Sequence, residues 1–173
     1  MLDYTLFGES HGPVVGVLLR HVPAGVPIDE LQMERDLLRR RPSGALATAR
    51  QEPDEVQFLS GVFQGRTTGM PLVMALPNWD ARPQDYEALR SVARPGHADY
   101  TARIKAKGFQ DYRGGGHFSG RLTAPLVAAG SIAKTVLASQ GVTVTAHVVD
   151  EENLRRRAAE AKEQGDSVGG QVA

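Results

Sequence analysis

The chain has 173 residues, 41% of them hydrophobic, which is enough for an ordinary core and indicates one domain or a large part of one. Twenty basic residues balance twenty acidic ones, so no overall field favours nucleic acid or an anionic membrane, and an anion site must be local. The absence of cysteine excludes disulfides, thiolate zinc sites and a cysteine nucleophile; with no visible signal peptide or membrane span, we expect a soluble cytoplasmic protein.

The first part of the chain predicts a strand, a tight loop and a helix. The apolar run Val14 to Leu19 predicts the strand, and the Pro and Gly residues of 23–27 predict the loop. Asp29 is a plausible N-cap for a helix whose leucines recur near helical spacing, and this helix ends in the basic run 39–41 before Pro42.

The next segments predict a hairpin. Residues 43–51 are small and polar, which predicts a surface loop. Residues 55–63 alternate in the manner of a strand, and the apolar run 70–76 completes an antiparallel pair before the loop 77–80.

The rest of the chain mixes helical and irregular segments. Residues 94–120 show no sustained period, and we assign that length to function. Residues 121–139 are rich in small and apolar residues and predict a buried, central helix. The remaining expectations are a helix at 85–92, a strand at 142–149, a charged helix at 153–162 and a flexible turn at 165–170. Because strands and helices do not alternate strictly, the predicted fold class is α+β with antiparallel pairing.

The first cluster with chemical potential is Gly8 to Gly12, where two glycines let Ser10 and His11 project together at a turn. A serine nucleophile is disfavoured, because adjacent residues rarely adopt hydrolase geometry and no nucleophile-elbow pattern is present. An ordinary polar turn before a strand is the alternative.

The second cluster is Arg94 to Tyr100, which holds a cation, an imidazole and a carboxylate in a loop bent by Pro-Gly. An imidazole, here that of His97, has a reference pKa of about 6.5 and can be protonated near neutral pH beside an anion, which a general acid requires. The alternative is a capped loop with a surface ion pair. A metal site built from His11, His97 and Asp99 matches no standard zinc spacing, so we expect no metal.

The third cluster is the triple-glycine segment Asp111 to Arg121, which we expect to run straight into the predicted central helix. Glycine N–H groups, the helix N-terminus and Ser119 with Arg113 or Arg121 would suit a phosphate cradle. The pattern is neither a Walker loop nor a Rossmann motif, and a glycine hinge remains the alternative. The basic run 39–41 is either a solvated helix end or a bidentate anion contact.

Taken in order, these clusters resemble the chorismate synthase family, and the resemblance covers residues 6 to about 140. The motifs that carry it are Phe7–Pro13, Val22–Gly25, Arg39–Pro42, Leu59–Phe63, Arg94–Tyr100 and Asp111–Gly116. Residues 128–134 and 165–170 resemble further family segments. Family members are roughly twice as long as this chain, so we interpret residues 1–173 as the N-terminal portion of one such domain, with no separate second domain.

The resemblance implies a lyase that eliminates phosphate from 5-enolpyruvylshikimate 3-phosphate to give chorismate in the shikimate pathway. It implies reduced FMN as cofactor, NADPH as a possible reductant, and a homotetramer. It also implies a sandwich of antiparallel sheets around central helices, incomplete here at the C-terminus. A non-catalytic flavin- or phosphate-binding remnant of the family is the alternative function.

The resemblance also implies roles for seven residues. His11 would protonate the departing phosphate with help from Ser10, and His97 would keep the reduced flavin correctly protonated. Arg40 matches a family arginine near the substrate or NADPH. The FMN contacts would be His117, Phe118 and Ser119, where many relatives carry Arg-Ser-Ser. The loop after Pro42 lacks a second family arginine and offers 45–47 (Ala-Leu-Ala) instead.

Overall fold

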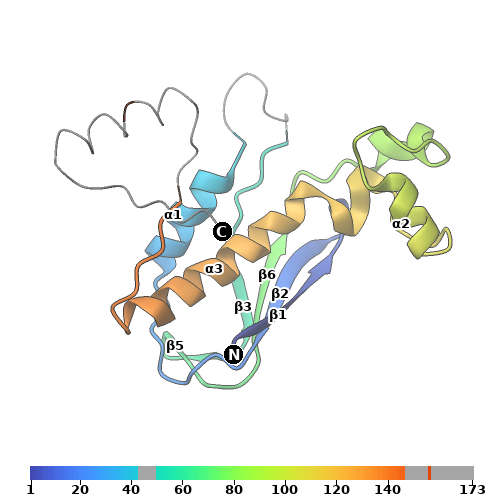
Figure 1. Ribbon diagram of the computed structural model, residues 1–173. Coiled ribbons are helices and arrows are strands. Elements are labelled where there is room, and N and C mark those ends of the chain that lie inside the picture. Colours follow the sequence, from blue (N-terminus) through green and yellow to red (C-terminus); the bar gives the residue numbers. More distant parts are fainter. Residues whose placement is uncertain (43–49, 147–155, 157–173) are drawn as a thin grey trace. The chain divides into compact units, whose positions relative to one another are not determined.

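Figure 1 shows the computed structural model of the chain, which describes residues 1–42, 50–146 and 156. The chain divides into two units, Met1–Val142 and Thr143–Ala173. Almost all of the second unit lies outside the described residues, so the fold below is that of the first. The expectation of one partial domain over residues 1–173 stays a prediction.

The centre of the first unit is a four-stranded antiparallel sheet in the order β1-β2-β6-β3. Its strands are β1 (Asp3–Gly8), β2 (Val14–Arg20), β3 (Gln57–Ser60) and β6 (Leu72–Pro77). Alternate residues of β2 and β6 are fully buried on one face, as Val17 and its partner Met74 are. The predicted strands at 14–19, 55–63 and 70–76 are confirmed in position.

The predicted hairpin is confirmed and carries an irregularity. β3 pairs with β6, and the register shifts between Phe58 and Ser60. At Gly61 (φ +84°) the chain leaves β3, and a small second sheet follows, formed by β4 (Val62–Phe63) and β5 (Arg66–Thr67). A Cβ at Gly61 would lie 2.6 Å from the Cα of Leu72, so the turn requires glycine.

Two helices cover the buried face of the sheet (Figure 1): α1 (Glu30–Arg40) and α3 (Thr123–Ala138). The predicted N-cap of α1 is confirmed, because the Asp29 carboxylate accepts the Gln32 N–H at 2.9 Å. α3 crosses β2 and β6 and packs against α1. The ammonium of Lys134 on α3 lies 2.8 Å from the carboxylate of Asp36 on α1. The shared core consists chiefly of Val15, Val17, Leu19, Met33, Leu37, Leu72, Met74, Leu76, Ala124, Ala128 and Ile132.

Several local predictions were wrong. The segment predicted as a helix at 85–92 is the 3₁₀ segment η1 (Pro83–Leu89), none of whose residues is fully buried. The irregular segment 94–120 contains the seven-residue helix α2 (Asp99–Lys105), which is too short to give a periodic signal. Strand β1 was not anticipated, since it is an edge strand with polar residues on its outer face.

The end of the described part also differs from expectation. Residues 142–146 do not form the start of the strand expected at 142–149. The helix expected at 153–162 and the turn expected at 165–170 fall outside the described residues, apart from Arg156.

The α+β class is confirmed, with antiparallel sheets and helices packed on one side. Among the described residues, no helix combines the length and the apolar character needed to span a membrane.

Candidate active site

Ser10 and His11 lie in the turn between β1 and β2 and are both buried, with 2% and 8% of their surface exposed. Asn78, just after β6, fixes this turn: its side-chain amide donates to the Glu9 carbonyl at 3.1 Å and to the Gly12 carbonyl at 2.8 Å. The sheet therefore presents both side chains at one defined place.

The Ser10 hydroxyl receives two hydrogen bonds. Its Oγ accepts from Arg50 Nη1 at 3.0 Å and from the Ser119 hydroxyl at 3.0 Å. Arg50 also donates to the Ser10 carbonyl at 2.8 Å. The Ser10 N–H donates to the Gly116 carbonyl at 3.0 Å, which joins the turn to the triple-glycine segment.

The imidazole of His11 is held by a backbone group. Its Nδ1 accepts the N–H of Arg82 at 3.0 Å, and its ring centroid lies 4.6 Å from that of Tyr86. Burial and then the charges of Arg50 and Arg113 lower the pKa of His11. The carboxylates of Asp111 and Asp85 act in the opposite direction and are outweighed.

The triple glycine lies in the irregular segment η2 (Arg113–Phe118), where all three glycines have left-handed φ. A Cβ at Gly114 would lie 2.4 Å from His11 Cδ2 and 2.6 Å from His11 Nε2. Only glycine therefore allows the segment to pass so close to the imidazole.

The expectation that this segment leads straight into the central helix was wrong, because η3 (Gly120–Leu122) intervenes before α3. The two arginines expected at the phosphate cradle have other partners. Arg113 pairs with Asp111 at 2.7 Å. Arg121 is buried and turns inwards to Asn78 and Asp54.

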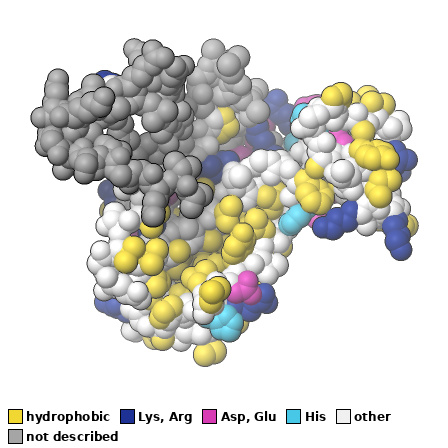
Figure 2. Space-filling model, in the orientation of Figure 1, with side chains coloured by type: hydrophobic (Ala, Val, Ile, Leu, Met, Phe, Trp, Pro, Cys, Tyr) yellow, Lys and Arg dark blue, Asp and Glu magenta, His cyan; other side chains and the backbone are white. Residues whose placement is uncertain are grey.

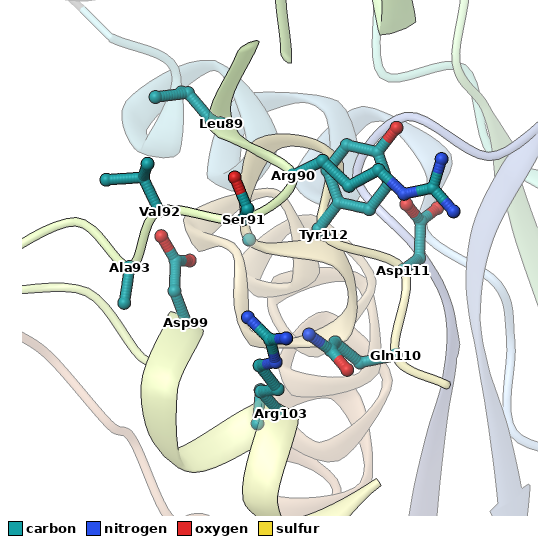
Figure 3. A pocket seen from close by; sticks show the side chains of 12 residues that line it. Leu89, Arg90, Ser91, Val92, Ala93, Asp99, Arg103, Gln110, Asp111 and Tyr112 are labelled. Carbon is teal, nitrogen blue, oxygen red and sulfur yellow. The ribbon is translucent and has the colours of Figure 1, made fainter. Parts of the chain in front are cut away.

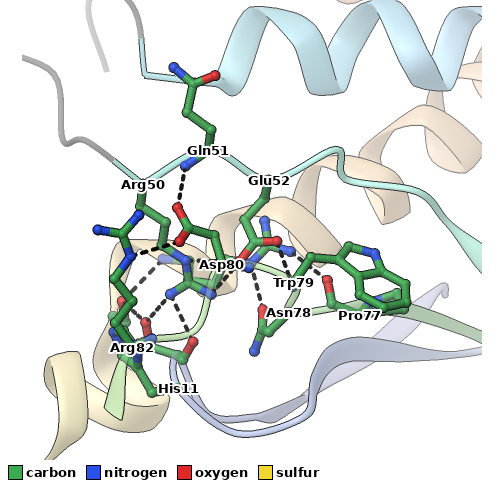
Figure 4. A network of polar contacts seen from close by, with 12 residues as sticks. His11, Arg50, Gln51, Glu52, Pro77, Asn78, Trp79, Asp80 and Arg82 are labelled. Atoms are coloured by element: carbon green, nitrogen blue, oxygen red, sulfur yellow. Dashed lines mark hydrogen bonds and ion pairs between the residues drawn. The ribbon is translucent and has the colours of Figure 1, made fainter. Parts of the chain in front are cut away.

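A second polar network supports the turn from the side of residues 50–52 (Figure 4). Arg50 pairs with Glu52 at 2.6 Å. The carboxylate of Glu52 accepts the N–H of Trp79 at 2.8 Å and that of Asp80 at 3.2 Å. The guanidinium beside Ser10 is thereby fixed to the loop after β6.

Asp54 is a buried carboxylate shared by three arginines. It contacts Arg121, Arg40 at 2.9 Å and Arg41 at 3.5 Å, and its own side chain is fully buried. Burial opposes its ionisation, but hydrogen bonds from Arg121 and Arg40 outweigh that cost and lower the pKa of Asp54. Because one negative charge faces three positive ones, this cluster keeps an excess of positive charge.

Arg40 therefore lies in the Asp54 cluster and not directly beside Ser10 and His11. Its guanidinium also reaches the Thr123 hydroxyl at 3.5 Å, at the start of α3. Among the described residues, Arg40 Nε is buried without a hydrogen-bond partner, and Arg41 Nε has only the more distant Asp54 carboxylate, at 3.5 Å. A buried guanidinium donor without a hydrogen bond suits an additional anion.

His97 is exposed, and its Nδ1 lies 3.1 Å from the Pro95 carbonyl. The neighbouring Arg94 makes the ion pair with Asp99 at 2.7 Å, within the motif where a surface pair was the alternative reading. No contact joins the imidazoles of His97 and His11 within the described part of the chain. Arg94 links the two motifs indirectly, because its guanidinium lies 5.8 Å from the ring of Tyr86, the residue that packs on His11.

His117, Phe118 and Ser119 divide into two groups. His117 and Phe118 have exposed rings in edge contact, and Lys105 lies 5.8 Å from the Phe118 ring centroid. The Nδ1 of His117 lies 3.0 Å from the Gly8 carbonyl. Ser119 instead turns inwards: its hydroxyl donates to Ser10 and accepts the N–H of Arg121 at 3.3 Å.

Two hollows lie in the lobe formed by η1, α2 and η2. The smaller one has a volume of about 30 Å³, and Figure 3 shows Arg103, Gln110 and Tyr112 among the side chains around it. It is far too small for a substrate, since ligand pockets measure roughly 300–1,000 Å³. A wider groove of about 610 Å³ lies between Arg90 and Phe109. Neither hollow is lined by any of the seven predicted site residues.

Within residues 1–42 and 50–146, no three His, Asp or Glu side chains gather closely enough to hold a metal ion. His11, His97 and Asp99 in particular do not assemble into such a group.

The sequence did not single out Arg50, Glu52, Asp54 or Asn78, although they fix Ser10 and Arg40. Their one visible signal is the density of charged residues in segments assigned to loops, 50–55 and 78–82. Charged residues in a loop are usually exposed to solvent, so these two segments were not interpreted as a buried network.

A family model described as chorismate synthase matches residues 2–156 of this chain. The chain belongs to the chorismate synthase family. The curated chorismate synthase of Aeropyrum pernix is 57% identical over 144 residues, which are 83% of this chain and 38% of that protein. The chorismate synthase of Thermococcus kodakarensis is 49% identical over 148 residues, or 86% of this chain and 42% of that protein.

The chorismate synthase of Pyrococcus abyssi is 41% identical over 199 aligned positions, covering 99% of this chain and 56% of that protein. A solved structure titled "Crystal Structure of Chorismate Synthase" superimposes with a TM-score of 0.56 at 28% identity, over 82% of this chain and 36% of that one. The chain thus spans about half the length of the chorismate synthases it matches.

Proposed function

We propose that this chain supplies part of the active site of a lyase that converts 5-enolpyruvylshikimate 3-phosphate into chorismate and phosphate, in aromatic amino acid biosynthesis. Membership of the chorismate synthase family supports the reaction. The observation that carries it at residue level is the approach of Ser10 and His11 to Gly114. A Cβ at Gly114 would lie 2.6 Å from His11 Nε2 and 3.4 Å from Ser10 Oγ, so the triple-glycine segment packs directly against both side chains.

Ser10 and His11 would contact the phosphate that leaves. In the elimination, the C–O bond breaks with its electron pair on the phosphate, and a carbon-bound proton is lost elsewhere on the ring. His11 donates a hydrogen bond through Nε2 to the departing phosphate, and the Ser10 hydroxyl donates a second hydrogen bond beside it. A buried position strengthens both interactions, because water competes poorly there.

Reduced FMN is part of the proposal, and the exposed rings of His117 and Phe118 fit it. Exposed aromatic faces suit a planar ring system, and the ammonium of Lys105 beside Phe118 suits an anion. Ser119 does not fit as a direct contact, because its hydroxyl is engaged with Ser10. When bound, reduced FMN supplies transient electron density without net redox change.

His97 and Arg40 complete the set. The Pro95 carbonyl can only accept, so it fixes the proton of His97 on Nδ1 and leaves Nε2 free to exchange a proton with the flavin. Arg40, in the positively charged Asp54 cluster, would bind an anionic group of the substrate or of NADPH. A tetrameric assembly and a cytoplasmic location belong to the same proposal.

The test is an anaerobic assay with reduced FMN and the enolpyruvyl ester, comparing His97→Ala with the matched exposed control Tyr100→Phe at the corresponding positions of a full-length family member that carries both residues. We expect His97→Ala to lower kcat by about 10²–10⁴-fold, the range of general acid–base catalysis, and Tyr100→Phe to change it little. Undiminished chorismate formation by His97→Ala would overturn its role.

A separate measurement addresses the alternative of a non-catalytic remnant. This chain is titrated with FMN and then assayed together with a separately expressed C-terminal half of a relative. FMN binding without any turnover in the mixture would favour the remnant over the lyase.

A further inference from the structure

The ring of Tyr86, in η1, contacts a residue of each of two histidine-bearing motifs, His11 in one and Arg94 in the other. We propose that Tyr86 is a positioning residue that fixes the plane of the His11 imidazole. Arg94, itself held by Asp99, keeps the ring of Tyr86 in place. This role rests on the proposed function for the importance of His11, but its first test measures the ring contact in this chain and involves neither flavin nor turnover.

One hydrogen bond does not define the plane of the His11 ring. The Arg82 N–H contacts Nδ1 at 3.0 Å and thereby locates one ring atom. The outer side-chain torsion of histidine is broad, because an sp³–sp² bond has no sharp staggered minima. A hydrogen bond weakens steeply only below a donor angle of about 120°, so the Arg82 contact leaves this torsion a range of some tens of degrees. A second contact is needed to fix the ring plane.

Tyr86 supplies that second contact. Its ring centroid lies 4.6 Å from that of His11, and the two ring planes are inclined at 53°. Aromatic rings pair favourably at centroid separations of about 4.5–7 Å in geometries that avoid a face-to-face sandwich. The two rings lie at the short end of this range. Rotation of the imidazole towards Tyr86 is therefore blocked, and rotation away from it gives up the contact.

The segment that carries Tyr86 has no part in the core. η1 contributes no residue to the shared core of the first unit, and Tyr86 is only half-buried. Arg82, whose N–H holds the imidazole, directly precedes η1. Both groups that hold the His11 ring therefore come from one short segment. Support of His11 accounts for the place of Tyr86 better than core packing does.

Arg94 holds Tyr86 in turn. Its guanidinium carbon lies 5.8 Å from the Tyr86 ring centroid, within the limit of about 6 Å for a cation–π contact. The guanidinium is itself fixed, because its Nε and Nη2 donate to the two carboxylate oxygens of Asp99 at 2.7 Å and 3.0 Å. A bidentate pair of this kind defines the guanidinium plane. Support thus runs from Asp99 through Arg94 and Tyr86 to His11.

The ring of Tyr86 carries this role, and its hydroxyl does not. Within the described part of the chain the hydroxyl makes no hydrogen bond, and both specific contacts of Tyr86 are made by the ring. Phenylalanine would keep both contacts. Leucine would keep an apolar side chain but lose both ring contacts. Tyr86→Phe and Tyr86→Leu therefore separate the ring from mere burial.

The first test is proton NMR of the aromatic side chains in this chain. We expect a nuclear Overhauser effect between the ring protons of Tyr86 and His11, and a ring-current shift of the His11 protons, because the centroids are 4.6 Å apart. Tyr86→Phe should keep both signals. Tyr86→Leu should move the His11 ring protons towards the shifts of an unstructured histidine. Absence of the Overhauser effect in the wild type, or unchanged His11 shifts in Tyr86→Leu, would overturn the proposal.

Two further variants control and extend this measurement. Tyr100→Leu is the matched control, since Tyr100 is 65% exposed, and it should leave the His11 shifts unchanged. Arg94→Met removes the guanidinium but keeps an unbranched stem. It should move the His11 shifts part of the way towards those of Tyr86→Leu, because an exposed cation–π contact is worth about two- to fivefold in an equilibrium. Wild-type His11 shifts in Arg94→Met would remove Arg94 from the proposal.

The consequence for the reaction is measured in a full-length family member that carries both His11 and Tyr86 at the corresponding positions. Tyr86→Leu should lower kcat by about 10–10²-fold, the cost of a misplaced group, and leave KM for the enolpyruvyl ester within a few-fold. Tyr86→Phe should retain wild-type kcat. An equal loss in both variants, or a raised KM with unchanged kcat, would contradict positioning by the ring. A wild-type enzyme without lyase activity would instead contradict the proposed function, while the ring contact in this chain would still stand or fall by its own spectrum.

Discussion

At the scale of single residues, the backbone decides whether Nε2 of His11, His97 and His117 donates or accepts a hydrogen bond. A carbonyl faces Nδ1 of both His97 and His117, so these rings leave Nε2 open as an acceptor or as a site for a second proton. An amide N–H faces Nδ1 of His11, so that ring offers Nε2–H as a donor. The imidazole of His11 thus has the opposite hydrogen-bonding polarity to those of His97 and His117.

Asp54 gives a prediction that depends on pH. Its folded-state pKa is lowered, so its stabilising contribution is fully present above the unfolded pKa of about 3.9 and is lost as pH falls through the lower folded value. Asp54→Asn should therefore lower the free energy of unfolding by about 3 kcal/mol at pH 7, the cost of breaking a buried ion pair. Urea unfolding at several pH values measures the difference, which should shrink below about pH 4.

Asparagine is a suitable replacement because it tolerates the φ of +53° at this position. Asp3→Asn serves as the control, since the Asp3–Arg20 pair is exposed and water screens it. Equal effects of the two substitutions at pH 7 would show that the three arginines do not depend on Asp54.

The sequence was sufficient to predict site residues that lie close together along the chain. It was insufficient to predict those that come into contact only in the folded structure. Ser10 and His11 stand in one glycine-flanked motif, and the Arg94–Asp99 pair lies within another. Arg50 meets Ser10 across 40 positions and Arg121 meets Asp54 across 67. No local pattern encodes such partners, because they are brought together by the pairing of β2 with β6 and the packing of α3.

At the scale of elements, burial explains which segments were predictable. α1 has an N-cap, a leucine-rich buried side and a basic end, and its bounds follow from the sequence. β2 and β6 are apolar runs in the centre of a sheet. By contrast η1 buries none of its residues, so no hydrophobic period marks whether it is α or 3₁₀.

The contact between the two long helices yields the next prediction. Asp36 is buried and Lys134 supplies its counter-charge at 2.8 and 2.9 Å. Lys134→Met should lower the free energy of unfolding by about 1–3 kcal/mol, since it leaves a buried carboxylate without its partner. The double variant Asp36→Leu with Lys134→Met should recover most of this loss. Urea unfolding of the three proteins checks both values, and a double variant no better than the single one would contradict the account.

At the scale of the whole molecule, α3 is apolar both on the side that faces the core and on the opposite side. It holds one charged residue, Lys134, in sixteen, and its inner side packs on α1, β2 and β6. The outer side carries Leu126, 40% exposed, and the partly buried Gly130, Ala133 and Leu137 at helical spacing. Hydrophobic side chains run along this helix in Figure 2. A helix that is apolar all round is typical of one covered on every side, and relatives of about twice this length have further chain available to cover it.

Leu126→Lys distinguishes an exposed from a covered stripe. In this chain, where Leu126 is partly exposed, the substitution should change the free energy of unfolding by no more than about 0.5 kcal/mol and should reduce self-association in sedimentation velocity. In a full-length family member with the same helix, it should cost about 2 kcal/mol or more, because an unpaired ammonium would be buried. Gln140→Lys, beyond the end of α3, should be neutral in both proteins. Equal tolerance of Leu126→Lys in the two contexts would mean that the second half of the family's length does not pack on this side of α3.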